Sequence, residues 1–125
     1  MILADSSVWI DHLRQSNPAL VRVLHAGEVC MHSQVLGELA CGSLKDRALR
    51  ISQWRAMPRL ASVTDAQAMA FIEWHRLMNR GLGFVDVHLL AAAAAAAAAV
   101  AGARLWTRDK RLAEAASALN LAHAV

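Results

Sequence analysis

The sequence predicts an α/β fold in which helices cover a parallel sheet on both faces. Short apolar runs alternate along the chain with longer segments of helical character. The apolar runs lack the polar–apolar alternation of half-exposed strands, as expected for strands that are buried on both faces. The chain has 125 residues, and we expect one domain over residues 1–125 because no linker or repeat divides it.

The predicted strands are the short apolar runs, and the predicted helices are the longer segments between them. The strands comprise residues 1–4, 28–31, 103–107 and 121–124, with a small strand or an extended link at 60–63. The helices comprise residues 18–25, 33–42, 43–57, 65–80, 85–101 and 109–119, after a loop that leads into a short helix within 6–13. Strands and helices therefore alternate over most of the chain.

Capping and breaking residues set the helix boundaries in the first half of the chain. Asn17 or Ser16 can cap the helix that Pro18 begins, since proline suits the first helical turn. This helix stops at Gly27. Ser33 is expected to cap the next helix, which ends near Gly42.

The same signals continue in the second half. Pro58 closes a basic helix, and Thr64 caps the helix that follows. The sequence Gly81-Leu82-Gly83 breaks that helix, and Gly102 ends the long helix after it. A helix then starts at Asp109.

Nine consecutive alanines, residues 91–99, lie in one predicted helix. Alanine has the highest helix propensity, and its small side chain lets neighbouring elements approach closely. The apolar segment 89–103 is shorter than the roughly 20 residues that span a membrane, so a buried helix is favoured. The sequence leaves a second interpretation open, in which these letters stand for side chains that were not identified.

Composition narrows the classes of protein. The net charge of +3 and the pI of about 9.5 are compatible with a polyanionic partner. Two cysteines supply neither a disulfide framework nor a zinc site, and the six histidines show no recurring ligand spacing. Because no basic segment followed by an apolar segment opens the chain, we expect a cytoplasmic protein.

Four acids stand out because they follow predicted strands or lie in apolar helical segments, and none of them has a Lys or Arg three or four residues away. We call them the acidic quartet: Asp5, Glu38, Asp86 and Asp109. Four other acids have such a local partner, as Asp11 has Arg14. Two quartet members follow predicted strands and two lie in helices that start at what should be the same edge of the sheet. Turn, cap or dipole roles could explain three of the acids one by one, but not Glu38 in mid-helix.

Carboxylates that share one cleft raise each other's pKa unless a cation compensates them. Oxygen ligands suit Mg²⁺ or Mn²⁺, and such a site could activate water against a phosphodiester. Ser7 and Thr107 stand two residues from Asp5 and Asp109, and either could orient a carboxylate. An equally good interpretation makes these two residues ordinary turn and cap residues.

Four sequence segments, in order, resemble the PIN-domain ribonucleases, and most closely the VapC toxins of VapBC toxin–antitoxin pairs. The segments are DSSVWID (5–11), VLGEL (35–39), GFVDVHLLA (83–91) and LWTRDKRL (105–112). The resemblance implies a PIN-like three-layer α/β/α fold with a central, mainly parallel sheet of four to five short strands. The alanine run departs from the family, whose members carry mixed apolar residues there.

The resemblance also implies an endoribonuclease that depends on Mg²⁺ or Mn²⁺, inhibits translation and cuts structured RNA such as tRNA or rRNA. It implies that the acidic quartet is the catalytic site, with Asp5 and Asp86 as the first metal ligands and Ser7 and Thr107 in support. A homodimer and a VapB-like antitoxin are the implied partners. The basic residues that fit an RNA path are Arg104, Arg108, Lys110 and Arg111.

Other classes of protein remain to be weighed. A haloacid dehalogenase-type phosphatase needs a second Asp two residues after Asp5, and the sequence has Ser7 there. The spacing of the acids fits a receiver domain poorly. A catalytically idle RNA- or protein-binding module on the same fold is the main alternative, since a fold does not fix a function. Trp9 and Trp106 could stack on bases, but core or interface positions are favoured.

Overall fold

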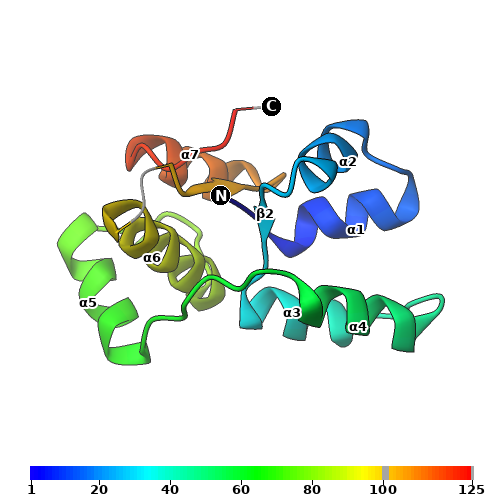
Figure 1. The fold of residues 1–125 in the computed structure, drawn as a ribbon. Coiled ribbons are helices and arrows are strands. Elements are labelled where there is room, and N and C mark those ends of the chain that lie inside the picture. Colours follow the sequence, from blue (N-terminus) through cyan, green and yellow to red (C-terminus); the bar gives the residue numbers. More distant parts are fainter. Residues whose placement is uncertain (100–101, 125) are drawn as a thin grey trace.

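A parallel sheet lies at the centre of the computed structural model, which describes residues 1–99 and 102–124 (Figure 1). Its strands are β1 (Ile2–Ala4), β2 (Val29–Cys30) and β3 (Arg104–Trp106), in the order β2-β1-β3. Ile2 pairs with Val29 on one side of β1, and Ala4 pairs with Trp106 on the other. The parallel sheet confirms the α/β class.

The described residues form a sheet of three strands, fewer than the four to five that were expected. At two predicted positions the chain makes only single bridges, which pair Met31 with Arg59 and Leu105 with Ala122. The Leu60 N–H donates to the Met31 carbonyl at 2.8 Å, and the chain then proceeds to the next helix. Because β2 has only two residues, it offers no ladder along which a longer strand could form.

Helices flank the sheet on both sides. In the view of Figure 1, α1 and α2 lie on one side of β2, and α5 and α6 lie on the other. Helices α6 and α7 contact β3, and α1 contacts β1. The helices are α1 (Ser6–Arg14), α2 (Pro18–His25), α3 (Ser33–Ala40), α4 (Arg47–Ala56), α5 (Asp65–His75), α6 (Phe84–Ala99) and α7 (Lys110–Ala118).

Helix caps explain where the observed boundaries agree with the sequence and where they differ. Helix α1 starts at once after Asp5, without the expected loop, because the Asp5 side chain caps it. His32 caps α3 instead of Ser33, which is the first helical residue. Helix α5 ends at His75 because Arg76 takes a left-handed conformation, so it does not reach Arg80. The predicted caps are confirmed at Asn17, Thr64 and Asp109.

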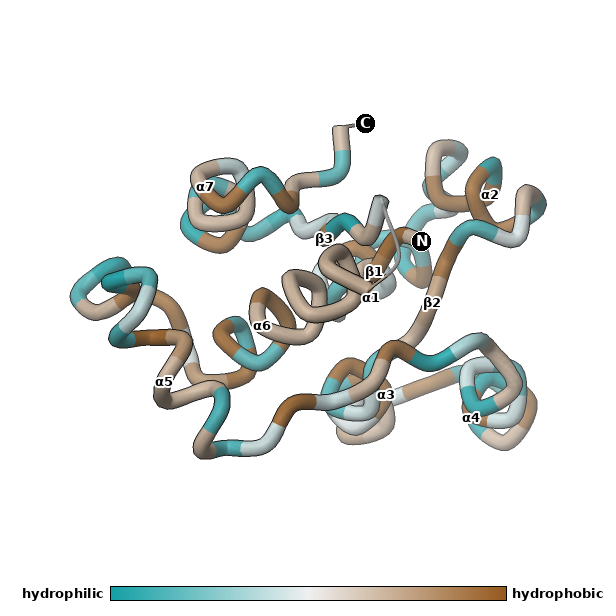
Figure 2. The backbone as a smooth tube through the Cα atoms, turned by 60° about the vertical axis from the view of Figure 1, so that its left-hand side comes forward, coloured by the Kyte–Doolittle hydropathy of each residue, from teal (hydrophilic) through white to brown (hydrophobic). Residues whose placement is uncertain are grey.

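The alanine helix is buried in its first half, whereas Ala95, Ala98 and Ala99 in its second half are exposed. Ala91, Ala92 and Ala93 are buried, and α6 contacts both α5 and β3. Figure 2 shows α6 passing close to β3, which it contacts, as the small side chains allow. The expected end of this helix at residue 101 lies outside the described residues. None of the described helices combines the length and apolar character that crossing a bilayer would require.

Two tryptophans that were considered for base stacking belong to the core. Trp9 is buried and meets Trp54 edge-on, with 5.9 Å between the ring centroids. Trp106 is buried on β3, where its ring packs against His123. Both are therefore unavailable for stacking, as the favoured interpretation expected.

The cap of α3 gives the protein a stability that depends on pH. His32 is fully buried, and its Nδ1 accepts the Gln34 N–H at 3.0 Å. Burial lowers the pKa of His32, and the positive charges of His88 and Arg59 lower it further. The folded protein therefore resists protonation of this imidazole, which must stay neutral to accept the hydrogen bond.

We expect the free energy of unfolding to fall as pH drops below 6.5, the ordinary pKa of histidine, because the unfolded chain binds the proton first. His32→Asn keeps a capping oxygen and removes the titration, so its stability should fall less over the same range. Chemical denaturation of both proteins between about pH 5 and pH 7.5 measures the difference. An equal loss of stability with falling pH in the two proteins would contradict the role of His32. His123 should add the same loss to both proteins, because burial also lowers its pKa.

Candidate functional site

Asp5 is the buried member of the acidic quartet and connects β1 to α1. One of its carboxylate oxygens accepts the Ser7 N–H at 3.0 Å and the Ser7 hydroxyl. The other oxygen accepts the Thr107 hydroxyl at 2.6 Å. Both oxygens of this buried carboxylate thus have donors, which stabilise its negative charge.

The two hydroxyl side chains join the start of α1 to the loop after β3. The Ser7 hydroxyl oxygen accepts the Arg108 N–H at 2.9 Å, and the Thr107 hydroxyl oxygen accepts the Asp109 N–H at 3.0 Å. Asp109 is thereby held beside Asp5 at the carboxyl edge of the sheet. The structure therefore brings together on Asp5 both hydroxyl residues that the sequence suggested.

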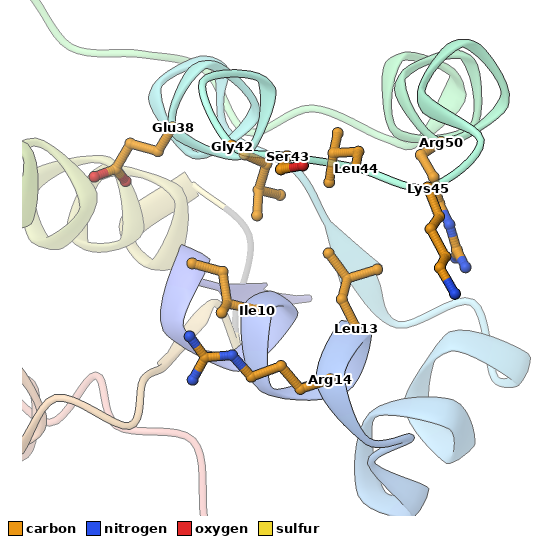
Figure 3. A pocket seen from close by; sticks show the side chains of 10 residues that line it. Ile10, Leu13, Arg14, Glu38, Gly42, Ser43, Leu44, Lys45 and Arg50 are labelled. Carbon is orange, nitrogen blue, oxygen red and sulfur yellow. The ribbon is translucent and has the colours of Figure 1, made fainter.

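The other acids reach this edge from different helices. Asp109 caps α7 by accepting the Arg111 N–H at 2.9 Å. Asp86 lies in the first turn of α6 and accepts the Gly83 N–H at 2.9 Å. Glu38 extends from the middle of α3 toward α6, as Figure 3 shows.

The acids are close enough to affect each other's ionisation. Glu38 is exposed as a residue, but partial desolvation of its carboxyl group raises its pKa. The Ser6 hydroxyl lowers that pKa, and the charges of Asp5 and Asp86 raise it. Burial also raises the pKa of Asp86; the Gly83 N–H lowers it, and the charges of Asp109 and Asp5 raise it. All four members of the quartet therefore share one field of negative charge.

The donor set fits a hard divalent cation. Four carboxylates supply only oxygen ligands, and a cation would relieve the repulsion that helps to raise the pKa values of Glu38 and Asp86. No three acidic, His or Cys side chains of the described residues already stand close enough to hold an ion. Binding would therefore require the carboxylates to move together, and hydrogen bonds from neighbouring residues hold Asp5, Asp86 and Asp109.

The basic residues near Asp109, which the sequence grouped as one RNA path, have different surroundings in the structure. Arg108 forms an ion pair with Asp11 of α1. Arg111 packs over Gly81, where a Cβ atom would lie 2.6 Å from the arginine Cδ. Both side chains therefore connect the β3–α7 segment to neighbouring elements. Lys110 is exposed at the start of α7.

Arg104 takes a different position from the other three. It begins β3 and pairs with Ile2, whereas Thr107 follows the opposite end of that strand. Its guanidinium donates to the Asn120 carbonyl at 2.6 Å. Arg104 therefore lies away from the edge of the sheet that carries the quartet.

The Asp11–Arg108 pair was missed because sequence spacing indicated Arg14 as the partner of Asp11. The two residues are far apart in the chain, so no local pattern could reveal their contact. Among the described residues the only other pair joins His88 and Asp65, at 2.9 Å. Arg14 instead lines a groove of about 500 Å³ that runs from Glu38 between α1, α3 and the start of α4 (Figure 3).

The hydroxyl of Thr107 should contribute measurably to stability. Thr107→Val keeps the side-chain shape and removes the donor to buried Asp5, so we expect a loss of about 1–3 kcal/mol. Thr107→Ser keeps the hydroxyl and should lose less. The free energies of unfolding of both variants at pH 7 make the test, and an equal loss in the two would contradict the role of the hydroxyl.

Asp86 should lower the stability of the metal-free protein at neutral pH. Its folded-state pKa lies above the ordinary 3.8, so the folded state binds more protons than the unfolded state between those two values. Stability therefore falls as pH rises through that range. Asp86→Asn, measured with a chelator present, should raise the free energy of unfolding.

Asp46→Asn is the matched control, because Asp46 is exposed and its side chain makes no cap hydrogen bond. We expect it to stay within about 0.5 kcal/mol of the wild type. An Asp86→Asn protein no more stable than this control would contradict the electrostatic cost.

Comparisons with known proteins agree with the resemblance seen in the sequence. A family model described as the PIN domain matches residues 2–118. The chain is 43% identical over 112 residues to Ribonuclease VapC32 of Mycobacterium tuberculosis, in strains CDC 1551 / Oshkosh and ATCC 25618 / H37Rv. The match covers 90% of this chain and 87% of the relative.

A solved structure shows a similar fold. The crystal structure of PAE2754 from Pyrobaculum aerophilum matches with a TM-score of 0.54 and 17% sequence identity, over 91% of this chain and 84% of the other. At this identity the likeness concerns the fold alone. With a family model that spans nearly the whole chain and a relative of 43% identity, this chain belongs to the PIN-domain family.

Proposed function

We propose that this protein hydrolyses RNA phosphodiesters with Mg²⁺ or Mn²⁺ held by the acidic quartet. A PIN-domain chain that is 43% identical to a VapC ribonuclease over 90% of its length is a ribonuclease of the VapC type, and VapC proteins are the toxins of toxin–antitoxin pairs. The observation that supports the catalytic site best is that desolvation and the charges of neighbouring quartet members raise the pKa values of Glu38 and Asp86. Such a concentration of charge has a use where a cation binds.

Each side chain of the quartet has a role in this proposal. PIN nucleases are in general metal-dependent, and a bound cation lowers the pKa of water and neutralises charge on the phosphoryl group. Asp5, fixed by Ser7 and Thr107, and Asp86, fixed by Gly83, would bind it directly. Asp109 would add a further negative charge beside the cation.

Glu38 is the best candidate for the base. Its raised pKa makes its carboxylate a better proton acceptor near neutral pH than an ordinary glutamate. It would take the proton of the attacking water while the phosphodiester bond breaks. It lies on α3, outside the hydrogen-bonded group around Asp5, and it meets the Ser6 hydroxyl.

The remaining assignments extend the same proposal. The substrate would be structured RNA such as tRNA or rRNA, and its cleavage would inhibit translation in the cytoplasm. Residues 1–125 would act as one domain. A VapB-like antitoxin and a second copy of the chain would be the protein partners, which the exposed Trp74 (83%) and Met69 (56%) favour, since large apolar side chains gather at interfaces.

A catalytically idle binding module is the alternative. It is favoured by one observation, that no described group of side chains already has the spacing of a metal site. RNA binding without cleavage in the presence of either metal would support this alternative.

Cleavage of total RNA and tRNA by antitoxin-free protein tests the proposal. We expect discrete fragments with Mg²⁺ or Mn²⁺ and none with EDTA. Asp5→Asn and Asp86→Asn should each lower the rate at least about 100-fold, because each removes a ligand charge. Asp46→Asn should cleave as the wild type does.

Two results would contradict the proposal. A folded wild type that cleaves no RNA with either metal would favour the binding module. Fragments that persist in both Asn variants would show that the activity does not arise from the quartet.

A further inference from the structure

The groove that begins at Glu38 has a cationic far end. Its volume of about 500 Å³ lies in the range of about 300–1,000 Å³ that holds a small ligand. Arg14 extends from the α1 wall, and Lys45 and Arg50 extend from the opposite wall (Figure 3). Lys45 and Arg50 lie together at the far end, whereas the Arg14 guanidinium lies on the same side as Ile10, nearer the Glu38 end (Figure 3).

These three cations lack the partners that would neutralise them. Sequence spacing assigned Asp11 to Arg14, but Asp11 pairs with Arg108. Neither Lys45 nor Arg50 forms an ion pair within the described residues. Glu38 is the only acid that lines the groove, so the far end carries an uncompensated positive charge.

The wall that carries Lys45 is held in place. The Arg47 guanidinium spans the end of α3 and donates to the Ala40 carbonyl at 2.6 Å and to the Gly42 carbonyl at 3.2 Å. These bonds satisfy carbonyls at the helix end and fix the turn that leads into α4. The groove is thus already formed in the free protein.

We propose that this groove binds the RNA backbone next to the scissile bond, with Arg14, Lys45 and Arg50 as phosphate ligands. This inference rests on the proposed ribonuclease function. The reacting phosphodiester would lie at the Glu38 end, and the phosphates that follow it would meet the cations. Phosphate recognition by Arg and Lys accounts for much of the affinity of proteins for nucleic acids.

The apolar lining suits the rest of a nucleotide. Ile10 is 41% exposed, and Leu13 also lines the groove between its two ends. Such side chains can contact the faces of sugars or bases without reading sequence. A protein segment could use the same apolar surface, but it would leave the three cations without anions unless it were acidic.

The test compares Arg50→Gln and Lys45→Gln with Arg55→Gln. Arg55 is on the same helix as Arg50 and loses the same charge, but it lines a separate depression with Arg47, Ala48, Ile51 and Ser52. Binding of a fluorescent single-stranded RNA would be measured by anisotropy over a range of salt, in an Asp86→Asn background that does not cleave. Hydrolysis of bis(p-nitrophenyl) phosphate, too small to extend along the groove, would be measured in the native background.

We expect each groove substitution to weaken RNA binding several-fold and Arg55→Gln to change it little. Each lost phosphate contact should lower the slope of log affinity against log salt by about 0.7, so the triple variant with Arg14→Gln should lose about 2. Arg50→Lys should keep most of the affinity. Hydrolysis of the small diester should stay within about twofold of the wild type, because the quartet is intact.

A folded triple variant with wild-type RNA affinity and salt slope would overturn the inference, and the groove would then be assigned to a protein partner. An equal loss of RNA affinity in Arg55→Gln would also overturn the inference, since the loss would then come from the change in net charge and not from the groove. Failure of the proposed function looks different, because the wild type would then hydrolyse neither RNA nor the small diester with any metal, whatever the groove variants bind.

Discussion

The hydrogen bonds to the buried carboxylate of Asp5 determine how the rest of the site is arranged. They connect the end of β1, the start of α1 and the loop after β3, because Ser7 and Thr107 both donate to this one side chain. The same hydroxyl oxygens accept the N–H groups of Arg108 and Asp109. A single charged group thus sets the relative position of elements that are distant in the chain, and an unpaired buried charge would be costly enough to enforce the arrangement.

The quartet concentrates negative charge at the carboxyl edge of the sheet, and the repulsion among its carboxylates lowers stability there. Helix caps hold Asp5 and Asp109, and a loop N–H holds Asp86, while the pKa values of Glu38 and Asp86 rise because burial and neighbouring carboxylates disfavour their charged forms. A fold selected only for stability would not concentrate charge in this way. The concentration is consistent with a site whose ligand is a cation, and the family to which the chain belongs uses metal ions.

Positive charge is distributed in two ways around this site. Arg108 and Arg111 connect the β3–α7 segment to α1 and to the Gly81 loop, so much of their role is structural. The cations of the α1–α3–α4 groove have no such partners. Sequence spacing assigned these roles differently, because a helical i, i+3 pattern cannot register a stronger partner supplied by a distant element.

By itself the sequence determined the α/β class, most helix starts and the identity of the unusual acids, because strand burial, capping and missing local partners are all short-range signals. The tertiary structure decided what depends on long-range contacts. It limited the sheet to three strands with two single bridges, and it made Asp5 a cap that starts α1 without a loop. It also paired Asp11 with Arg108 instead of Arg14 and so left a cationic groove, since such contacts follow from the packing of elements that no local pattern records.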